Sequence, residues 1–336
     1  MPITIRDVAL QAGVSRGTVS RVLNDSPRVD PLTRAKVLET IRDLDYVPSQ
    51  AARQLMIGRT MNVGVIVPFL TRPSVVERLR GVESALEGSS YDLVVYNTET
   101  VERRDRVLRD AARRQRVDGL VVVSLRPHDS EVERVRAAEL PLILVDAHHR
   151  LLPRVVIDDV EGGRLAARHL LELGHRRIGF IGDLPRNPFH FVSSRLRFRG
   201  VQSATADAGV SIDPDLVATG AHSVEAARDL AGALLAHPQR PTALVLASDT
   251  QALGALEAAR HRGLRVPEDL SIIGYDDIEV AGYVGLTTVR QPLFESGHRG
   301  AVLLLEALGG RPVPPVRETL SVELIVRATT GPAGSP

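Results

Sequence analysis

The sequence predicts a small all-α domain at the N-terminus, followed by a larger α/β region whose two lobes are built on parallel sheets. Two short helix patterns separated by a glycine turn occupy the first 24 residues. From residue 62 onward, continuous apolar runs alternate with amphipathic helix patterns, and this series repeats. Apolar strands separated by helices indicate parallel sheets that are covered on both faces. A chain of 336 residues that is 43% hydrophobic has room for two or three such domains.

The first two helices are defined by their capping residues. Thr4 is a suitable N-cap with Asp7 three residues later, so the first helix should begin at Ile5. Gly13 should end that helix, because glycine adopts the left-handed conformation at low cost. Ser15 can then cap a second helix. Two short helices joined by a glycine-containing turn form a helix-turn-helix unit.

The second helix has one apolar face and one polar face. Val19, Val22 and Leu23 follow helical spacing and should point inward. The outer face is small, polar and cationic, and it suits the major groove of DNA. It consists of Arg16, Gly17, Thr18, Ser20, Arg21 and Asn24. A helical bundle with another role would show the same two faces, so this spacing alone leaves both interpretations open.

A third helix and a short linker complete the N-terminal region. Asp30 is an N-cap followed by Pro31 at the first helical position, which predicts a helix over residues 32–44. Its inner stripe is Val37, Ile41 and Leu44, and Tyr46 and Val47 should close the bundle. The segment 48–58 is a short helix former without a core of its own.

Composition restricts the class of protein. Cysteine is absent, which fits a reducing compartment and excludes a disulfide scaffold. No N-terminal segment resembles a signal peptide and no apolar run approaches ~18 residues, so we expect a cytoplasmic location and no membrane partner. The net charge is only +1, yet residues 1–60 carry nine Lys and Arg against six Asp and Glu, a local balance of +3.

Three ordered motifs in the first sixty residues carry a family resemblance. They are Thr-Ile-Arg-Asp-Val-Ala at 4–9, Gly-Val-Ser-x-x-Thr-Val-Ser-Arg-Val-Leu-Asn at 13–24, and Ala-Ala-Arg-x-Leu followed by Gly-Arg-Thr at 51–60. The chain resembles the lactose-repressor (LacI/GalR) family of bacterial transcription factors. The resemblance implies a homodimer that reads a near-palindromic double-stranded operator. It also implies hinge helices that pair in the minor groove, where apolar side chains can wedge between bases.

The resemblance assigns DNA-contacting roles residue by residue. The groove-facing pair falls on Arg16 and Gly17, and Arg16 has the fork that reads guanine. The residue inserted between base steps is Leu55, and Ser49 stands where the family often has Asn. The positions that touch phosphates or base edges in relatives are Thr4, Ser15, Thr18, Ser20, Arg21, Asn24, Arg28, Thr33 and Tyr46.

The remaining chain reads as alternating strands and helices. The expected strands are 62–68, 91–96, 117–123, 142–146, 155–158, 177–181, 243–247, 270–274 and 286–289. The expected helices are 75–86, 101–114, 130–138, 160–173, 196–208 and 250–262. Two such lobes resemble the type I periplasmic-binding-protein fold, which is the effector core of this family.

These elements give the expected domain boundaries. The helix-turn-helix domain should span 1–48, the hinge helix and linker 49–61, and the effector-binding and dimerisation core 62–329. Within the core, the first lobe is expected at 62–158 with 290–318, and the second at 159–289 with 320–327. The Gly- and Pro-rich tail 330–336 should be loose.

An effector site is expected where strands end, because ligands of open α/β sheets lie beyond the carboxyl ends of strands. Asp146, Asp158, Asp249 and Asp276 stand at such ends, although an isolated Asp there is more often a cap or loop residue. The resemblance assigns ligand positions to Arg197, Asp249 and Asp276. Carboxylates accept sugar hydroxyls and an Arg fork donates to others. The full set of expected effector residues is Phe69, Arg72, Asp146, Phe191, Arg197, Asp249 and Asp276.

The chemistry of the effector is less defined by the sequence. Few aromatic residues are available to stack on a sugar ring, since they make up 3% of the chain. Arg72, His148 and His149 suggest an anionic ligand such as a phosphorylated or carboxylated sugar. Adjacent histidines without a Cys or an i+4 partner are a poor zinc pattern, so we expect no metal site.

Three classes of function compete. The first is a transcriptional regulator that is controlled by a sugar-like effector, and we expect it to be a repressor. The second is the solute-binding protein of a sugar transporter. The N-terminal sixty residues favour the first. The third is an α/β enzyme, but the sequence lacks a Gly-rich dinucleotide loop and a Gly-x-Ser-x-Gly elbow. We therefore expect no cofactor and no catalytic residues.

Overall fold

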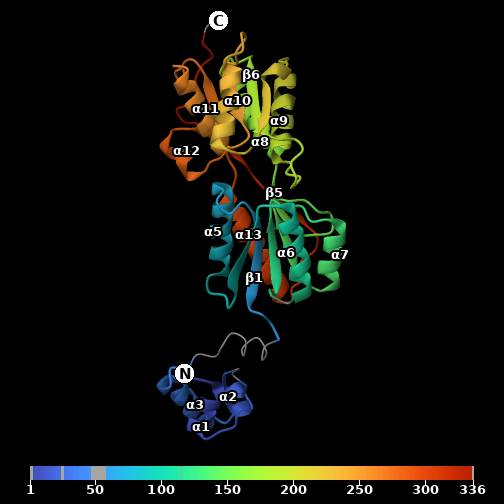
Figure 1. Ribbon diagram of the computed structural model, residues 1–336, viewed down its shortest axis with the longest axis vertical. Helices are drawn as coiled ribbons and strands as arrows, with labels where there is room; N and C mark the ends of the chain where they lie inside the picture. Colours follow the sequence, from blue (N-terminus) through green and yellow to red (C-terminus); the bar gives the residue numbers. More distant parts are fainter. Residues whose placement is uncertain (1–2, 24–25, 47–57, 115, 335–336) are drawn as a thin grey trace. The chain divides into compact units, whose positions relative to one another are not determined.

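The structure, a computed structural model, describes residues 3–23, 26–46, 58–114 and 116–334 (Figure 1). Its chain forms two compact units, 1–61 and 62–336, with the boundary between Met61 and Asn62. The first unit is helical, and the second contains two six-stranded sheets. The predicted fold class is confirmed: a helical N-terminal domain precedes a two-lobed α/β core.

The first unit is held together by capped helices around a small core. Its helices are α1 (Ile5–Ala12), α2 (Arg16–Leu23) and α3 (Pro31–Asp43). The carboxylate of Asp7 accepts hydrogen bonds from the backbone amide and the hydroxyl of Thr4, at 2.8 and 2.7 Å. Gly13 ends α1 with a φ of 65°, as its position predicts. The buried apolar residues are Val8, Ala9, Ala12, Val19, Val22, Val37 and Tyr46.

The first lobe is built on an all-parallel sheet with the order β11-β5-β4-β3-β1-β2. Its strands are β1 (Asn62–Pro68), β2 (Asp92–Thr98), β3 (Gly119–Val123), β4 (Leu142–Val145), β5 (Arg154–Ile157) and β11 (Arg317–Leu320). Its helices are α5 (Pro73–Leu86), α6 (Val101–Arg114), α7 (Asp129–Ala137) and α13 (Leu293–Leu308). Alternate residues of β1 face opposite cores, because Val65 packs with α5 and α13 while Ile66 packs with α6 and α7.

The second lobe repeats this design. The sheet has the order β12-β10-β9-β8-β6-β7, and the β10–β12 pair is antiparallel. Its strands are β6 (Ile178–Asp183), β7 (Val217–Gly220), β8 (Ala243–Leu246), β9 (Ser271–Asp276), β10 (Thr287–Arg290) and β12 (Glu323–Ile325). Its helices are α8 (Asp159–Glu172), α9 (Ser193–Asp207), α10 (Val224–Leu235), α11 (Asp249–His261), α12 (Glu279–Tyr283) and the 3₁₀ turn Pro214–Leu216.

Glycine allows one helix pair in each lobe to approach closely. A Cβ at Gly81 of α5 would lie 1.9 Å from the carbonyl oxygen of Phe294 in α13. In the second lobe, a Cβ at Gly200 of α9 would lie 1.9 Å from the carbonyl oxygen of Val160 in α8. These backbone contacts exclude any side chain, so they fix how each pair packs on its sheet.

The chain passes between the lobes after β5, after β10 and after β11. The strand β11 continues to Leu320, two residues beyond the expected end of the first lobe. The expected series lacked β7, α10, α12, α13 and β11 as named elements. All three connections leave the carboxyl ends of strands, which is where ligands of open α/β sheets bind. An effector site is therefore expected in this region.

The tail differs from its prediction. We expected residues 330–336 to be loose, but the described part of this segment docks on the second lobe. The carbonyl of Gly331 lies 3.1 Å from Nε2 of the buried His175, and the hydroxyl of Thr330 lies 3.0 Å from Nε2 of His169. The amide of Ala333 donates to the carbonyl of Leu173. These polar contacts order a segment that its Gly and Pro content suggested would be mobile.

Candidate DNA-binding face and effector cavity

The outer face of α2 presents the predicted polar residues to solvent. Arg16, Gly17 and Arg21 are exposed, whereas Val19 and Val22 of the opposite face are buried. The Oγ of Ser15 accepts a hydrogen bond from the amide of Thr18 at 3.1 Å, so it caps the helix as expected. The recognition face is therefore formed by a helix whose orientation is fixed by its own core.

The other expected DNA-contacting residues differ in their surroundings. Thr4 and Arg28 are exposed, while Thr33 is half-buried in the first turn of α3. Tyr46 lies in the core of the bundle with 7% of its surface exposed, so most of its ring is unavailable to a partner. Three further residues of this set lie outside the described residues: Asn24, Ser49 and Leu55.

A cavity of about 60 Å³ lies between the two lobes of the core. Its charged walls combine three arginines with three aspartates: Arg72, Arg78, Arg197, Asp146, Asp183 and Asp276. Five of the seven expected effector residues line it, namely Arg72, Asp146, Phe191, Arg197 and Asp276. The polar lining therefore comes from both lobes and from the ends of several strands.

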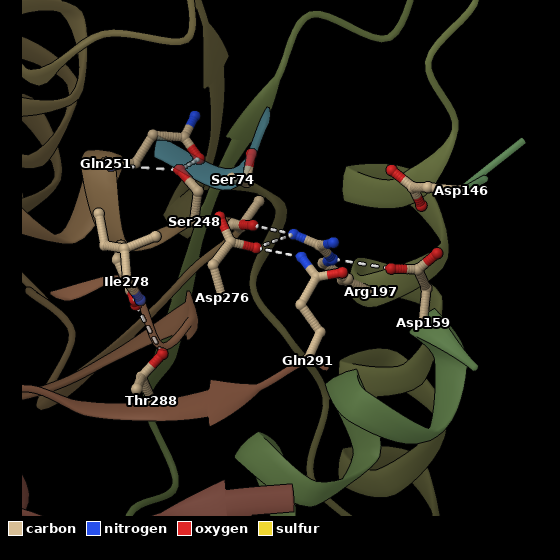
Figure 2. Close-up of polar contacts among 12 residues, drawn as sticks. Ser74, Asp146, Asp159, Arg197, Ser248, Gln251, Asp276, Ile278, Thr288 and Gln291 are labelled. Atoms are coloured by element: carbon tan, nitrogen blue, oxygen red, sulfur yellow. Dashed lines mark hydrogen bonds and ion pairs between the residues drawn. The ribbon is translucent and has the colours of Figure 1, made fainter. Parts of the chain in front are cut away.

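Arg197 is the centre of the polar network on the side of the second lobe (Figure 2). Its Nε donates to Oδ1 of Asp159 at 2.9 Å, and its Nη1 donates to the carbonyl of Ala247 at 2.6 Å. The same Nη1 lies 3.5 Å from Oδ1 of Asp276. The guanidinium also stacks 3.6 Å from the ring centroid of Tyr275. These contacts bury the guanidinium of Arg197 and fix its orientation.

A second network on the side of the first lobe connects to the first through Gln291. The Nη2 of Arg78 donates to Oε1 of Gln291 at 2.9 Å and lies 3.2 Å from Oδ2 of Asp146. Ser124 donates its hydroxyl to the same Asp146 oxygen at 2.7 Å. Gln291 in turn donates its amide to Oδ1 of Asp276 (Figure 2). One glutamine side chain thus bridges the charged groups of the two lobes.

Aromatic side chains lie beside this cavity, but only Phe191 lines it, so the expected effector residue Phe69 is placed one step behind Arg72. The guanidinium of Arg72 lies over the ring of Phe69, 4.2 Å from its centroid, and 5.7 Å from the centroid of Phe191. Phe189 contacts both rings, with centroid distances of 5.4 Å to each. No hydrogen bond or ion pair joins the Arg72 side chain to any other residue of the described segments. Its donors therefore remain available to a ligand.

Burial controls the protonation of the cavity carboxyls. It raises the pKa of Asp276 and the pKa of Asp159, and Arg197 opposes both shifts. For Asp183, burial acts in the same direction, but the hydrogen bond from His222 and its charge lower the net pKa. Burial lowers the pKa of Arg72, and the nearby charges of Asp183 and Asp276 oppose that shift.

One expectation about the strand-end aspartates, the effector role of Asp249, needs correction. Asp249 does not line the cavity: its Oδ1 accepts from the Thr288 hydroxyl at 2.5 Å and its Oδ2 from the Ile278 amide at 2.9 Å. It is fully buried, and it joins β10 to the turn that precedes α12. Asp158 caps α8 by accepting from the amide of Glu161, while its neighbour Asp159 reaches Arg197.

The histidines proposed to attract an anion are also placed elsewhere. The Nε2 of His149 lies 2.9 Å from Oδ1 of Asp129, and its Nδ1 accepts from the amide of Leu151. His148 is absent from the lining of the inter-lobe cavity among the residues that the structure describes. Only Arg72 of that trio faces the cavity.

Seven polar residues of this cavity were not predicted from the sequence: Ser74, Arg78, Ser124, Asp183, Ser193, His222 and Gln291. Ser124, Asp183 and Gln291 stand at or just after the ends of β3, β6 and β10, so the strand-end rule would have found them. Arg78 lies in the middle of α5, where an arginine carries no local signal of burial.

Comparison with known proteins places the chain in a family. Residues 4–49 match the family of bacterial regulatory proteins named after lacI, and residues 167–330 match a periplasmic binding protein-like domain. Over 333 residues the chain is 34% identical to the HTH-type transcriptional repressor CytR of Escherichia coli K12, covering 97% of this chain and 96% of that one. The chain belongs to the LacI family of transcriptional regulators.

Other members of the LacI family agree over nearly the full length. The HTH-type transcriptional regulator DegA of Bacillus subtilis is 34% identical over 340 residues, 99% of each chain. The lac repressor dimer bound to operator and the anti-inducer ONPF superimposes with a TM-score of 0.86 at 30% identity, covering 98% of this chain and 100% of that one. A regulator named CelR, solved with cellobiose, has a TM-score of 0.72 at 32% identity, covering 97% and 99%.

These relatives are DNA-binding regulators, and the N-terminal match distinguishes this LacI-family chain from a solute-binding protein of a transporter. Among the described helices, none combines the length and apolarity that crossing a membrane requires.

Proposed function

We propose that the chain is a homodimeric repressor whose operator affinity is controlled by a small polyhydroxylated effector bound between the lobes of its core. The observation that carries this proposal is the inter-lobe cavity, where fixed arginines and aspartates from both lobes face one another. Carboxylates accept hydrogen bonds from vicinal hydroxyls and guanidinium forks donate to others, which is the chemistry that a sugar requires.

The aromatic lining supports the same class of ligand. Phe191 lines the cavity beside the free donors of Arg72, and an apolar ring beside polar groups fits the apolar face of a sugar. One LacI-family relative was solved with cellobiose, and a second, 29% identical, with bound ribose. The balance of three arginines and three aspartates favours a neutral effector in this cavity.

For an effector to enter, either the lobes must move apart or the polar contacts among the cavity residues must be replaced by contacts to the ligand. A volume of about 60 Å³ is well below the ~300 Å³ at the lower end of small-molecule sites. A ligand must therefore replace the direct contacts of Asp146 and Asp276 with its own hydroxyl groups. Gln291 donates to Asp276 and accepts from Arg78, and Arg78 in turn pairs with Asp146. Replacing these contacts by ligand binding therefore changes the interactions that hold the lobes together. A ligand with different affinities for two lobe arrangements shifts their populations.

DNA recognition in this proposal uses two copies of α2. Each helix enters the major groove with Arg16 at its exposed face, and the two half-sites lie about one helical turn apart, ~34 Å. The sequence resemblance assigns the hinge residues 49–61 to the minor groove. Lobe movement then alters how the two N-terminal units engage the operator.

Calorimetry of the full-length protein against a panel of neutral sugars and their charged derivatives tests the effector site. We expect one neutral polyol to bind, and Asp146→Asn to weaken its binding by about tenfold or more, because a carboxylate hydrogen bond to a hydroxyl is lost. The matched control is Asp229→Asn, whose side chain is 72% exposed on α10. Equal affinities of wild type and Asp146→Asn for every bound polyol would contradict this site.

A further inference from the structure

A second cavity, of about 410 Å³, adjoins the effector cavity at Phe191. Its walls come from both lobes: residues 126–129 follow β3, while the lining of the second lobe runs from Pro185 in the β6–α9 segment to Arg195 in the first turn of α9. Arg126, Arg195 and His190 are the lining side chains that are cationic or can become so, whereas Nε2 of His128 accepts from the Arg104 guanidinium at 2.7 Å and stays neutral. Phe191 is the residue that the linings of the two cavities share.

The two arginines of this cavity are unpaired. Neither Arg126 nor Arg195 makes a side-chain hydrogen bond or ion pair with another residue of the described segments. The acidic residue in the wall, Asp129, directs its Oδ1 to Nε2 of His149 at 2.9 Å, and its charge also attracts Arg126 without forming an ion pair. The guanidinium forks of Arg126 and Arg195 are therefore free to donate, and a fork matches the oxygens of a phosphate.

Backbone dipoles reinforce the positive charge. The helix α9 begins at Ser193, so the second lobe contributes a helix N-terminus to the wall, whereas the N-terminus of α7 is capped and carries Asp129 and Glu131 in its first turn. The N-cap of α9 is Val192, which provides no side-chain acceptor, and its first turn carries no acidic residue. The free amides at that end add to the field of the two arginines.

The cavity has a fixed wall on the side of the second lobe. Phe189 extends from the β6–α9 segment into the apolar core of the first lobe, where it is 5% exposed. Asn187 holds Phe191 by accepting from its amide at 2.8 Å and donating to its carbonyl at 3.1 Å. The segment that leads into α9, the helix that carries Arg195, is thus anchored across the lobe boundary, and an anion bound here would contact both lobes.

We propose that this second cavity binds a phosphate group of a small molecule, held between Arg126 of the first lobe and Arg195 of the second. The site is separate from the polyol site, because its cations are distinct and Phe191 is the one residue in both linings. An anion that bridges the lobes stabilises the arrangement in which both arginines reach it. The site therefore gives the regulator a second input, sensitive to phosphorylated metabolites.

Binding of three probes to the full-length protein without DNA tests this site: inorganic phosphate, glucose 6-phosphate and glucose. We expect a phosphate-bearing probe to bind. A higher affinity for glucose 6-phosphate than for inorganic phosphate would identify the ligand as an organic phosphate, and the reverse order would identify it as the free ion. The double variant Arg126→Gln/Arg195→Gln should weaken that binding by about tenfold per arginine removed, the loss typical of one charge-assisted hydrogen bond.

The matched control is Arg186→Gln/Arg199→Gln, which removes two exposed arginines from the same segment and helix without changing the cavity lining. Thermal unfolding should be the same for both double variants. The proposal is overturned if neither phosphate probe binds, if the control loses binding equally, or if glucose competes with equal affinity. The variant Asp146→Asn separates this site from the effector proposal, since it should leave phosphate binding unchanged.

Discussion

Arg197 holds together more of the ligand region than any other single side chain described above. It contacts Asp159, Asp276 and the Ala247 carbonyl, and it stacks on Tyr275. Burial alone would lower the pKa of Arg197, but the carboxylate of Asp159 raises it above its ordinary value. This arginine therefore remains charged while it is buried, and its neighbours depend on that charge.

Replacing Arg197 with Ala should lower the free energy of unfolding by about 3–5 kcal/mol, because it leaves buried carboxyl groups without their partner. The control is Arg199→Ala, two residues along the same helix and exposed, which should change stability by less than about 0.5 kcal/mol. Urea denaturation followed by circular dichroism gives both values. A loss below about 1 kcal/mol for Arg197→Ala would show that the network contributes little to folding.

Asp249 should make stability depend on pH. Burial and the nearby charge of Asp276 raise its pKa to about 8, well above the ordinary value of an aspartate. The folded state therefore retains a proton that the unfolded state releases above about pH 4, and stability is lost as pH rises from there to about 8. The variant Asp249→Asn cannot lose a proton, yet its amide can still pair with Thr288 and its oxygen with the Ile278 amide.

We expect the stability of Asp249→Asn relative to wild type to increase between pH 4 and pH 8, as measured by denaturant titrations at several pH values. The difference should be constant above about pH 8, once the wild-type carboxyl is ionised. A difference that stays flat from pH 4 to pH 8 would mean that Asp249 is ionised in the folded protein.

At the level of single residues, strand-end position was the useful signal. It led to Asp146 and Asp276, which line the effector cavity, and the family resemblance led to Arg197. It also led to Asp249, which packs against β10 instead, because a strand end does not specify which side of the sheet a side chain takes. The buried position of Arg78 depends on the packing of α5 against α13, two elements that are distant in the sequence.

At the level of elements, the recognition helix α2 gives a test that separates stability from DNA contact. A Cβ at Gly17 would lie 3.6 Å from the Oγ of Ser15, which is an ordinary contact, and no positive φ is required there. Replacing Gly17 with Ala should therefore stabilise the helix by about 0.5–1 kcal/mol. The same methyl group should weaken operator binding if this face approaches the bases closely.

Thermal unfolding and fluorescence anisotropy with operator DNA measure the two effects of Gly17→Ala. The matched control is Gly232→Ala on α10, where nothing lies within 4 Å of the added Cβ and no DNA role is proposed. It should raise stability without changing operator affinity. Unchanged operator affinity for Gly17→Ala would place this residue away from the DNA surface.

Most elements could be predicted from local patterns, and those that were missed lacked such patterns. The strand β7 is short, half-exposed and without a long apolar run, so it did not register as a strand. The strand β11 is Arg-Glu-Thr-Leu, which alternates weakly and pairs only at the edge of its sheet. The tail was expected to be loose because the His169 and His175 side chains that hold it are more than 150 residues away in the sequence.

At the level of the whole molecule, exposed apolar residues support the proposed homodimer. Val76 of α5 is 41% exposed and Tyr283 of α12 is 81% exposed. The two helices lie along the same side of the core in Figure 1. Replacing Tyr283 with Asp should shift the sedimentation of the protein from dimer toward monomer and reduce operator affinity. Replacing Leu151, which is 42% exposed in a loop, with Asp should change neither.

The central claim is that occupancy of the inter-lobe cavity sets how firmly a pair of N-terminal helical units holds a specific operator. The most direct measurement is the affinity of the full-length protein for an operator selected from genomic fragments, with and without the polyol found by calorimetry. We predict preference for a two-half-site duplex over scrambled DNA and a change of about fivefold or more with ligand, which is lost in Asp146→Asn. Equal binding to all duplexes, or an operator affinity that ignores a bound ligand, would contradict the account.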